Sequence, residues 1–186
     1  RELANEDSQG LPAASLADTK MFGEEHSPTL AADHPRRFGD YDLLEELGKG
    51  GMGVVYKARQ VSANRLVALK LIRPDQLSQF LPEERENALA RFRTEVQAAA
   101  KLEHDHVVTV YDVGEIGGQS YYAMRFVDGE SLKDKLADGP LEPEDAARSM
   151  EQVSAALAEA HCHGILHRDP QPQNVLVDGR QDRALL

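Results

Sequence analysis

The chain has 186 residues, of which 41% are hydrophobic and 28% charged, and its formal net charge is -11. That composition is typical of a globular protein with a buried core, and the acidic balance excludes the basic surface that nucleic-acid binding requires. The one cysteine, Cys162, excludes an internal disulfide, and no apolar run approaches the ~18–20 residues of a membrane span. We therefore expect a cytoplasmic chain with no membrane segment of its own, although a longer parent protein could be anchored.

Residues 1–38 differ from the rest of the sequence. They are polar and acidic, they follow no periodic pattern, and they include Pro12, Pro28 and Pro35. Such a segment buries too little apolar area to offset the entropy cost of ordering it, so we expect a disordered leader or linker. The first residue is Arg1 rather than Met, which suggests a processed product or a fragment.

From residue 41 onward, short runs rich in β-branched and aromatic residues alternate with turn residues, which predicts consecutive strands. The runs cover residues 41–47, 54–59, 65–72, 107–113, 121–127 and 174–178. Gly117 and Gly118 predict a tight turn between the fourth and fifth runs. Two longer segments, 82–102 and 143–161, carry apolar residues at helical spacing and predict amphipathic helices. Their apolar faces are Leu89, Phe92, Val96 and Ala99, and then Ala146, Met150, Val153, Leu157 and Ala160.

A glycine cluster follows the first predicted strand. Gly48, Gly50 and Gly53 have the spacing G-x-G-x-x-G. Glycine lets backbone N–H groups approach phosphate oxygens, but the pattern alone also fits an ordinary glycine-rich hairpin turn. A dinucleotide-binding fold requires a helix to begin at the glycines, whereas the residues that follow, 54–56, favour a strand. A strand–glycine–strand hairpin that covers a nucleotide therefore fits the sequence better than a Rossmann turn.

A lysine interrupts the third predicted strand. Lys70 ends the apolar run "VALK", where it could simply extend to solvent at a sheet edge. Glu95 borders the apolar face of the next predicted helix, and such a glutamate is commonly solvated. Together the two predict an ion pair that directs the ammonium group toward phosphates. An exposed pair contributes only about 0–1 kcal/mol to stability, so its value would be orientation.

The segment "ILHRDPQPQN", residues 165–174, places Asp169 five residues before Asn174. This segment and four others resemble, in order, the motifs of a bacterial eukaryotic-like Ser/Thr protein kinase, and the resemblance extends from Phe38 to Leu186. Five motifs in the same order are far more specific than any one of them. The other four are "LGKGGMGVVYKA" (47–58), "VALK" (67–70), "RFRTE" (91–95) and "YYAMRFVDGESL" (121–132).

The resemblance implies an α+β, protein-kinase-like fold. Its small lobe, at about residues 39–123, would be an antiparallel five-stranded sheet with one helix. A hinge at about 124–128 would lead into the start of a mainly helical large lobe at 129–186. The implied cofactors are ATP and Mg²⁺, and the implied partner is a protein substrate with a Ser or Thr hydroxyl.

The resemblance also implies roles for particular residues. Lys70 would hold the ATP phosphates, oriented by Glu95, and Asp169 would accept the proton of the substrate hydroxyl. Asn174 would ligate magnesium, and Arg168 would bind an activation-loop phosphate. The residues implied to bind ATP are Leu47, Gly48, Gly50, Gly53, Val55, Ala68, Lys70, Met124, Phe126, Val127 and Leu176.

Three features depart from the family pattern. Pro170 biases Asp169 toward an extended backbone, and Gln171 stands where the family has a lysine that contacts the γ-phosphate. Loss of such a donor commonly costs about 10²–10³ in rate. No Asp-Phe-Gly follows Asn174 within the 186 residues, so we expect this chain to be inactive alone. The sequence leaves open a kinase fragment, a pseudokinase or nucleotide-binding scaffold, and a gene remnant that does not fold.

Overall fold

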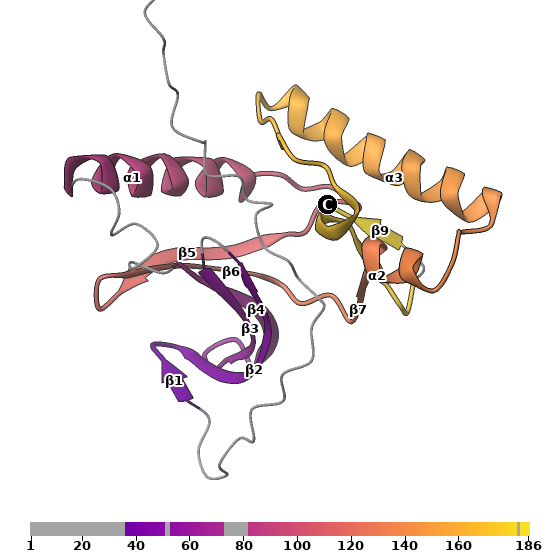
Figure 1. The fold of residues 1–186 in the computed structure, drawn as a ribbon. Coiled ribbons are helices and arrows are strands. Elements are labelled where there is room, and N and C mark those ends of the chain that lie inside the picture. Colours follow the sequence, from indigo (N-terminus) through magenta and orange to yellow (C-terminus); the bar gives the residue numbers. More distant parts are fainter. Residues whose placement is uncertain (1–35, 51–52, 73–81, 182) are drawn as a thin grey trace, which may run out of the picture.

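The computed structural model describes residues 36–50, 53–72, 82–181 and 183–186. The prediction of a disordered leader falls mostly on residues 1–35, which lie outside the described residues. The described part has a curled sheet with a helix against it, and beyond a short connection a second part with helices and a small sheet (Figure 1). This arrangement confirms the predicted α+β architecture, and we call its two parts the small lobe and the large lobe.

The small-lobe sheet is antiparallel throughout, with the strand order β1-β2-β3-β4-β6-β5. The described residues thus give one strand more than the five predicted, because β1 pairs with the start of β2 at the sheet edge. Gly117 and Gly118 both have positive φ, and they join β5 to β6 in the predicted tight turn. The strands are β1 (Arg36–Phe38), β2 (Tyr41–Gly50), β3 (Gly53–Gln60), β4 (Arg65–Ile72), β5 (Val110–Ile116) and β6 (Gln119–Arg125).

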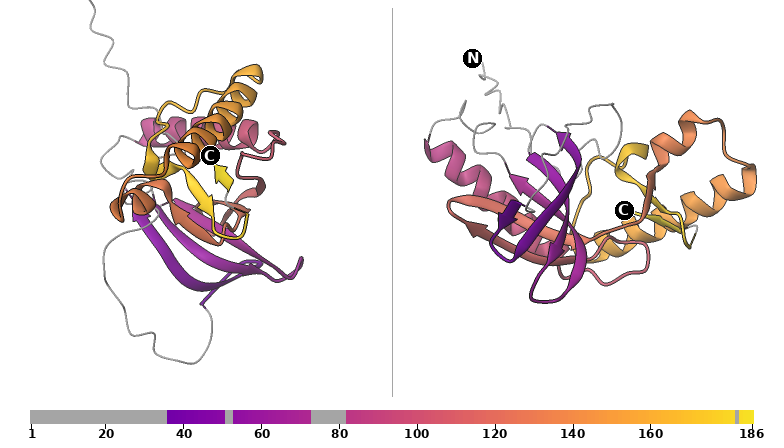
Figure 2. Two further views of the ribbon diagram at one scale, coloured as in Figure 1. Left: turned by 90° about the vertical axis from the view of Figure 1, so that its right-hand side faces the viewer. Right: turned by 90° about the horizontal axis from the view of Figure 1, so that it is seen from below.

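The two faces of this sheet pack against different partners because side chains alternate along a strand. On β4, Val67, Leu69 and Leu71 belong to the cluster inside the curled sheet, whereas Ile72 packs on the opposite face against helix α1 (Pro82–Ala99). Lys70 has the same parity as Ile72, so it faces the α1 side as well. Figure 2 shows α1 lying along one side of the sheet.

Helix α1 packs through the apolar face that its sequence predicts. Phe92 and Val96 are buried against Ile72 and Tyr122, and Leu89 packs at the border of the cluster. Burying a side chain of this size contributes about 1.5–3 kcal/mol, so these contacts hold the helix against the sheet. Because the helix is fixed in this way, the neighbouring side chains on α1 have defined positions over the sheet.

A polar contact holds the opposite face together. The hydroxyls of Tyr41 and Tyr121 both donate to Oδ2 of Asp112, at 2.7 and 2.9 Å. Burial is the main cause that raises the pKa of Tyr121 to about 12, and the Asp112 carboxylate is the second cause. The same two causes raise the pKa of Tyr41 by a larger amount. Phe38 of β1 stacks edge-on against Tyr121, with ring centroids 5.5 Å apart. The residues just before the predicted domain start therefore contribute to the small-lobe core.

The large lobe has its own small antiparallel sheet, in the order β7-β8-β9. Its core joins Leu132, Val153 and Val177 with neighbouring apolar residues. Ser131 caps α2 by accepting a hydrogen bond from the backbone N–H of Asp134. The elements are β7 (Gly129–Ser131), α2 (Leu132–Ala137), α3 (Pro143–Cys162), the 3₁₀ turn η2 (Pro172–Asn174), β8 (Leu176–Asp178) and β9 (Arg183–Leu185).

Some boundaries and faces differ from the sequence prediction. Strand β5 begins at Val110 rather than at 107, because the N–H of Val108 donates to Leu186 and the carbonyl of Thr109 accepts from Arg125. Met150 of α3 is 56% exposed, so it does not belong to the buried face of that helix. Among the described helices, none is long and apolar enough to cross a bilayer.

Candidate active site

Lys70 lies at the centre of the small-lobe sheet, where β4 pairs it with Val55 on β3 and with Tyr122 on β6. Its side chain is only 1% exposed, and its Nζ lies 5.9 Å from the centre of the Tyr122 ring. Ala68 and Met124 face each other one step along the same face. A buried ammonium group is costly unless it is compensated, so the sheet holds Lys70 in an environment that favours an anionic partner.

The predicted glycine hairpin joins β2 to β3, and Gly50 pairs with Gly53 next to residues 51 and 52, which lie outside the described part. Gly48 pairs with Val55, which is fully buried. A Cβ on Gly53 would lie 2.2 Å from the carbonyl oxygen of Leu71. Gly53 is therefore required for the close approach of β3 to β4, a reason for glycine that the sequence pattern did not reveal.

The segment after β6 connects the two lobes. Met124 ends the α1-facing row of β6, and the ring of Phe126 lies 4.7 Å from Nζ of Lys57. Val127 is buried with Leu176 and Leu185 of the large-lobe sheet. The predicted hinge residues thus lead from the small-lobe sheet to β7, which pairs with β8, the strand that carries Leu176.

The loop that contains Asp169 is held by side-chain amides. Asn174 donates through Nδ2 to the backbone oxygen of Asp169 at 3.0 Å and to its Oδ2 at 3.3 Å. The amide of Gln171 donates to the other carboxylate oxygen, Oδ1, and its backbone N–H donates to the carbonyl of Asp169. The loop therefore accommodates Pro170, and the amide groups of Asn174 and Gln171 both orient the carboxylate of Asp169.

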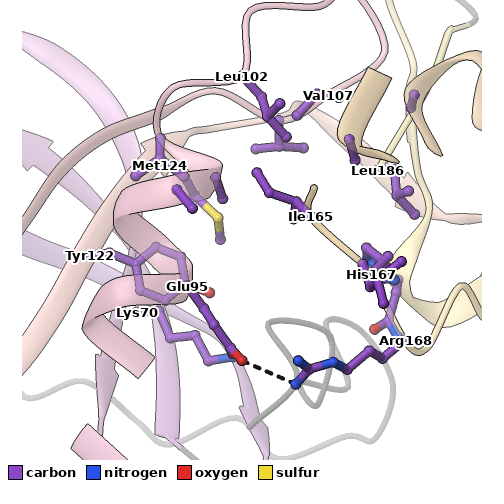
Figure 3. Close-up of a pocket in the computed structure, with 18 of the residues that line it drawn as sticks. Lys70, Glu95, Leu102, Val107, Tyr122, Met124, Ile165, His167, Arg168 and Leu186 are labelled. Carbon is purple, nitrogen blue, oxygen red and sulfur yellow. Dashed lines mark hydrogen bonds and ion pairs between the residues drawn. The ribbon is translucent and has the colours of Figure 1, made fainter. Parts of the chain in front are cut away.

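Glu95 forms an ion pair with Arg168 across the gap between α1 and this loop, with 3.0 Å between Oε1 and Nη1 (Figure 3). Arg168 has a φ of 67°, a left-handed backbone that non-glycine residues rarely adopt. The predicted pairing of Glu95 with Lys70 stays a prediction, although Figure 3 shows both side chains on the same side of the pocket. The contact of Arg168 with an activation-loop phosphate likewise stays a prediction. In this structure the guanidinium of Arg168 pairs with the carboxylate of Glu95 instead.

His167 precedes Arg168 and lines the same pocket. Burial lowers the pKa of His167, against the opposite effect of nearby Asp169. Within the described residues its buried Nδ1 has no hydrogen-bond partner. A neutral, partly buried imidazole of this kind suits a packing role in the pocket wall.

These side chains border a cavity of about 300 Å³ between α1, the sheet and the Asp169 loop (Figure 3). The cavity brings together six of the predicted site residues, from five parts of the chain. Apolar side chains such as Leu102, Val107 and Ile165 form the rest of its wall, together with Leu186. The six are Val55, Lys70, Glu95, Met124, Asn174 and Leu176.

The remaining predicted residues do not line this cavity. Gly48, Gly50 and Gly53 lie on strands β2 and β3, and Phe126 and Val127 lie on the connection between the lobes. Sequence reasoning did not find the apolar part beyond Met124, because its residues come from segments with no shared motif. The remaining predicted residues outside the cavity wall are Leu47, Ala68 and Asp169.

Comparison with known proteins identifies this arrangement. The family model for the protein kinase domain matches residues 41–185. The chain belongs to the protein kinase family. It is 45% identical over 144 residues to the serine/threonine-protein kinase PknD of Mycobacterium tuberculosis, covering 76% of this chain and 20% of PknD. It is 40% identical over 141 residues to PrkC of Bacillus subtilis, covering 75% of this chain and 21% of PrkC.

Solved structures agree with this family. The kinase domain of Mycobacterium tuberculosis PknI matches with a TM-score of 0.70 and 32% identity, over 84% of this chain and 60% of that one. An apo form of PpkA has a TM-score of 0.73 at 24% identity, which shows the fold alone. The chain spans about a fifth of the length of the curated relatives it matches.

Protein kinases generally use ATP with Mg²⁺, and the chemistry of this site fits them. Lys70 supplies a buried cation, and Val55 and Leu176 supply apolar surface from opposite lobes. Nδ2 of Asn174 donates a hydrogen bond to Asp169, which leaves the amide oxygen of Asn174 as the atom that could bind a cation. The described residues hold no group of three or more His, Cys, Asp or Glu side chains suited to a metal. Mg²⁺ commonly binds through one or two protein oxygens and the substrate phosphates, which agrees with such a sparse set.

Proposed function

We propose that this chain forms the ATP-binding part of a Ser/Thr protein kinase, which transfers the γ-phosphoryl group of ATP to a protein hydroxyl. The observation that carries the proposal is the convergence of Lys70, Met124, Asn174 and Leu176 on one cavity beside Glu95. These residues come from two lobes and from separate motifs of the sequence, and their meeting at one cavity supports the roles proposed for them.

The adenine base would lie between the two lobes on the hinge side of Met124. Val55, Ala68 and Leu47 would cover it from the small lobe, and Leu176 would support it from below. Phe126 and Val127 would offer backbone groups to the base, and Gly48, Gly50 and Gly53 would cover the phosphates. The burial of Val55 and Leu176 supports these positions, because both present rigid apolar surface to the gap between the lobes.

The reacting groups would be placed by the Asp169 loop. Asn174 holds the Asp169 carboxylate by a hydrogen bond, and that carboxylate would accept the proton of the substrate hydroxyl. Lys70 would hold the phosphates, and Asn174 would present its amide oxygen to Mg²⁺. When bound, the metal supplies charge neutralisation for the phosphates.

Nucleotide binding by the 186-residue chain tests this proposal. Isothermal titration with ATP should detect a single site when Mg²⁺ is present, and a weaker one when the metal is chelated. Titration with a ribose phosphate that lacks the base provides the control for non-specific phosphate binding. No heat of binding with ATP and Mg²⁺, from a chain shown to be folded by circular dichroism, would contradict the proposal.

One observation favours a second candidate, a pseudokinase or nucleotide-binding scaffold. Gln171, at the position where the family has a lysine, donates to Asp169 and so occupies the carboxylate that would serve as base. An amide also lacks the positive charge that would stabilise the transferring phosphoryl group. In any longer natural product that contains these residues, restoring leucine and lysine at Pro170 and Gln171 discriminates the two. Activity that appears only after restoration favours the scaffold, and activity in the parent sequence favours the kinase.

A further inference from the structure

The connection between the lobes carries a charge pair that the proposed function does not use. Arg125, the last residue of β6, reaches Asp178, the last residue of β8, with 3.3 Å between Nη2 and Oδ2. The Asp178 side chain is 7% exposed and that of Arg125 is 30% exposed. The pair thus joins the small-lobe sheet to the large-lobe sheet through a nearly buried carboxylate.

The carboxylate of Asp178 is held firmly in place. Its second oxygen, Oδ1, accepts the backbone N–H of Arg180 at 2.9 Å. On the neighbouring strand Gly129 pairs with Asp178, and a Cβ there would lie 1.9 Å from the carbonyl oxygen of Val177. The large-lobe end of the pair is therefore rigid, and Arg125 is the side chain that couples the small lobe to it.

The position of Arg125 links it to the width of the cleft, by which we mean the gap between the two lobes. Its backbone N–H donates to Thr109 and its Cα pairs with Val67, so its main chain moves with the small-lobe sheet. Met124, the residue before it, lines the cavity. A shift of Arg125 against Asp178 would therefore change the distance between the sheet and Leu176.

A second ion pair spans the cleft at another point. Glu95 of α1 meets Arg168 of the Asp169 loop, and these side chains are 31% and 46% exposed. Water screens such a pair, whereas a nearly buried carboxylate is costly to leave without its cation. Of the two ion pairs, the one between Arg125 and Asp178 is the stronger constraint on how the lobes are placed. It acts together with the backbone hydrogen bonds that join His106 and Val108 to Leu186.

We propose that Arg125 and Asp178 form a clamp that fixes the separation of the two lobes and thereby sets the affinity of the cleft for nucleotide. They are positioning residues, which act through the backbone of the connection and not by contact with the ligand. The proposed effect on nucleotide affinity rests on the proposed ATP-binding function, whereas the proposed effect on the separation of the lobes does not.

The test measures lobe placement, affinity and stability on the same variants. The chain has one native cysteine, Cys162, which is exposed in the large lobe, and Arg59→Cys adds one exposed site on β3. Spin labels at these two sites report the distribution of distances between the lobes. Titration with ATP and Mg²⁺ gives the affinity, and thermal unfolding gives Tm.

Three variants separate a clamp from a merely structural pair. Arg125→Met leaves the carboxylate without its cation, and should broaden the label distances, weaken ATP binding about tenfold and lower Tm by about 5 °C. Asp178→Asn keeps the acceptor for the Arg180 N–H, and should have the same effect on the distances. The double variant should recover most of the Tm, because no unpaired charge remains, but should keep the broad distances and the weak binding.

Two further variants complete the test. Arg180→Met is the matched control, because it removes a pair between the β8–β9 turn and Asp128 whose two side chains are well exposed, and it should leave the distances and the affinity unchanged. Arg125→Lys keeps the charge and should restore most of the affinity. The clamp is overturned if Arg125→Met is folded with unchanged distances, or if the double variant regains the parent distances. If the parent chain does not bind ATP, the proposed function fails, and the label distances still decide the clamp.

Discussion

The sharpest test of the proposed site replaces the buried lysine, Lys70→Met. Methionine has a similar length and no charge, so it fills the space between Val55 and Tyr122 on the neighbouring strands. Lys70 is 1% exposed, and a hydrogen bond to a charged group is worth about 1.5–3 kcal/mol. Its loss should therefore weaken ATP binding about 10- to 150-fold.

The same substitution should barely change stability. Removing a buried ammonium removes its desolvation cost and also the contact that Lys70 makes in the folded chain, and these two effects oppose each other. Glu95 keeps its ion pair with Arg168. We expect the free energy of unfolding in urea to stay within about 1 kcal/mol of the parent value. Affinity and stability thus respond differently, which distinguishes a lost ligand contact from a damaged fold.

The assay is titration with ATP and Mg²⁺, paired with urea unfolding followed by circular dichroism. Lys133→Met on α2 is the control, because that lysine is exposed, does not line the cavity and is not among the predicted site residues. Parent-like affinity in Lys70→Met would refute the role of Lys70 in phosphate binding. Equal loss of affinity in the control would show instead that net charge governs binding.

Three further predictions follow from the described contacts. Burial lowers the pKa of His167, so the unfolded state binds more protons below about pH 6.5 and stability falls as the pH is lowered. His167→Asn should therefore reduce the pH dependence of the free energy of unfolding in urea between about pH 7 and pH 5. Glu95→Gln breaks the half-exposed pair with Arg168 and should cost no more than about 1 kcal/mol in urea unfolding, and a larger loss would mean that the pair is better shielded than its exposure indicates. Tyr41→Phe removes one donor to Asp112 and should lower unfolding free energy by about 1 kcal/mol, whereas no loss would show that water replaces the hydroxyl.

Local patterns in the sequence predicted the elements of the fold well. Helix α1 packs through Phe92 and Val96, which lie on the face that their spacing predicts. The turn at Gly117 and Gly118 has the positive φ values that only glycine adopts easily. These features succeed because each depends on residues that are close in the chain.

Patterns failed where the deciding contact came from far away. Strand β9 was not predicted, because three residues carry little periodicity and Leu185 is buried by residues from distant segments, Val127 and Leu176. The burial of Met150 was predicted from its spacing, yet it is exposed, since spacing does not show what covers a helix. Strand β1 was placed in the leader, and it is ordered by pairing with β2.

The sequence by itself determined which residue types could form a nucleotide site: the glycine hairpin, Lys70, Asp169 and Asn174, in an order typical of one family. Only the tertiary structure decided how they meet. It paired Glu95 with Arg168 across the cleft and placed Arg125 against Asp178. Spacing along a chain fixes the face of a strand or helix, but the distance between two lobes depends on packing and charge between segments that the sequence keeps apart.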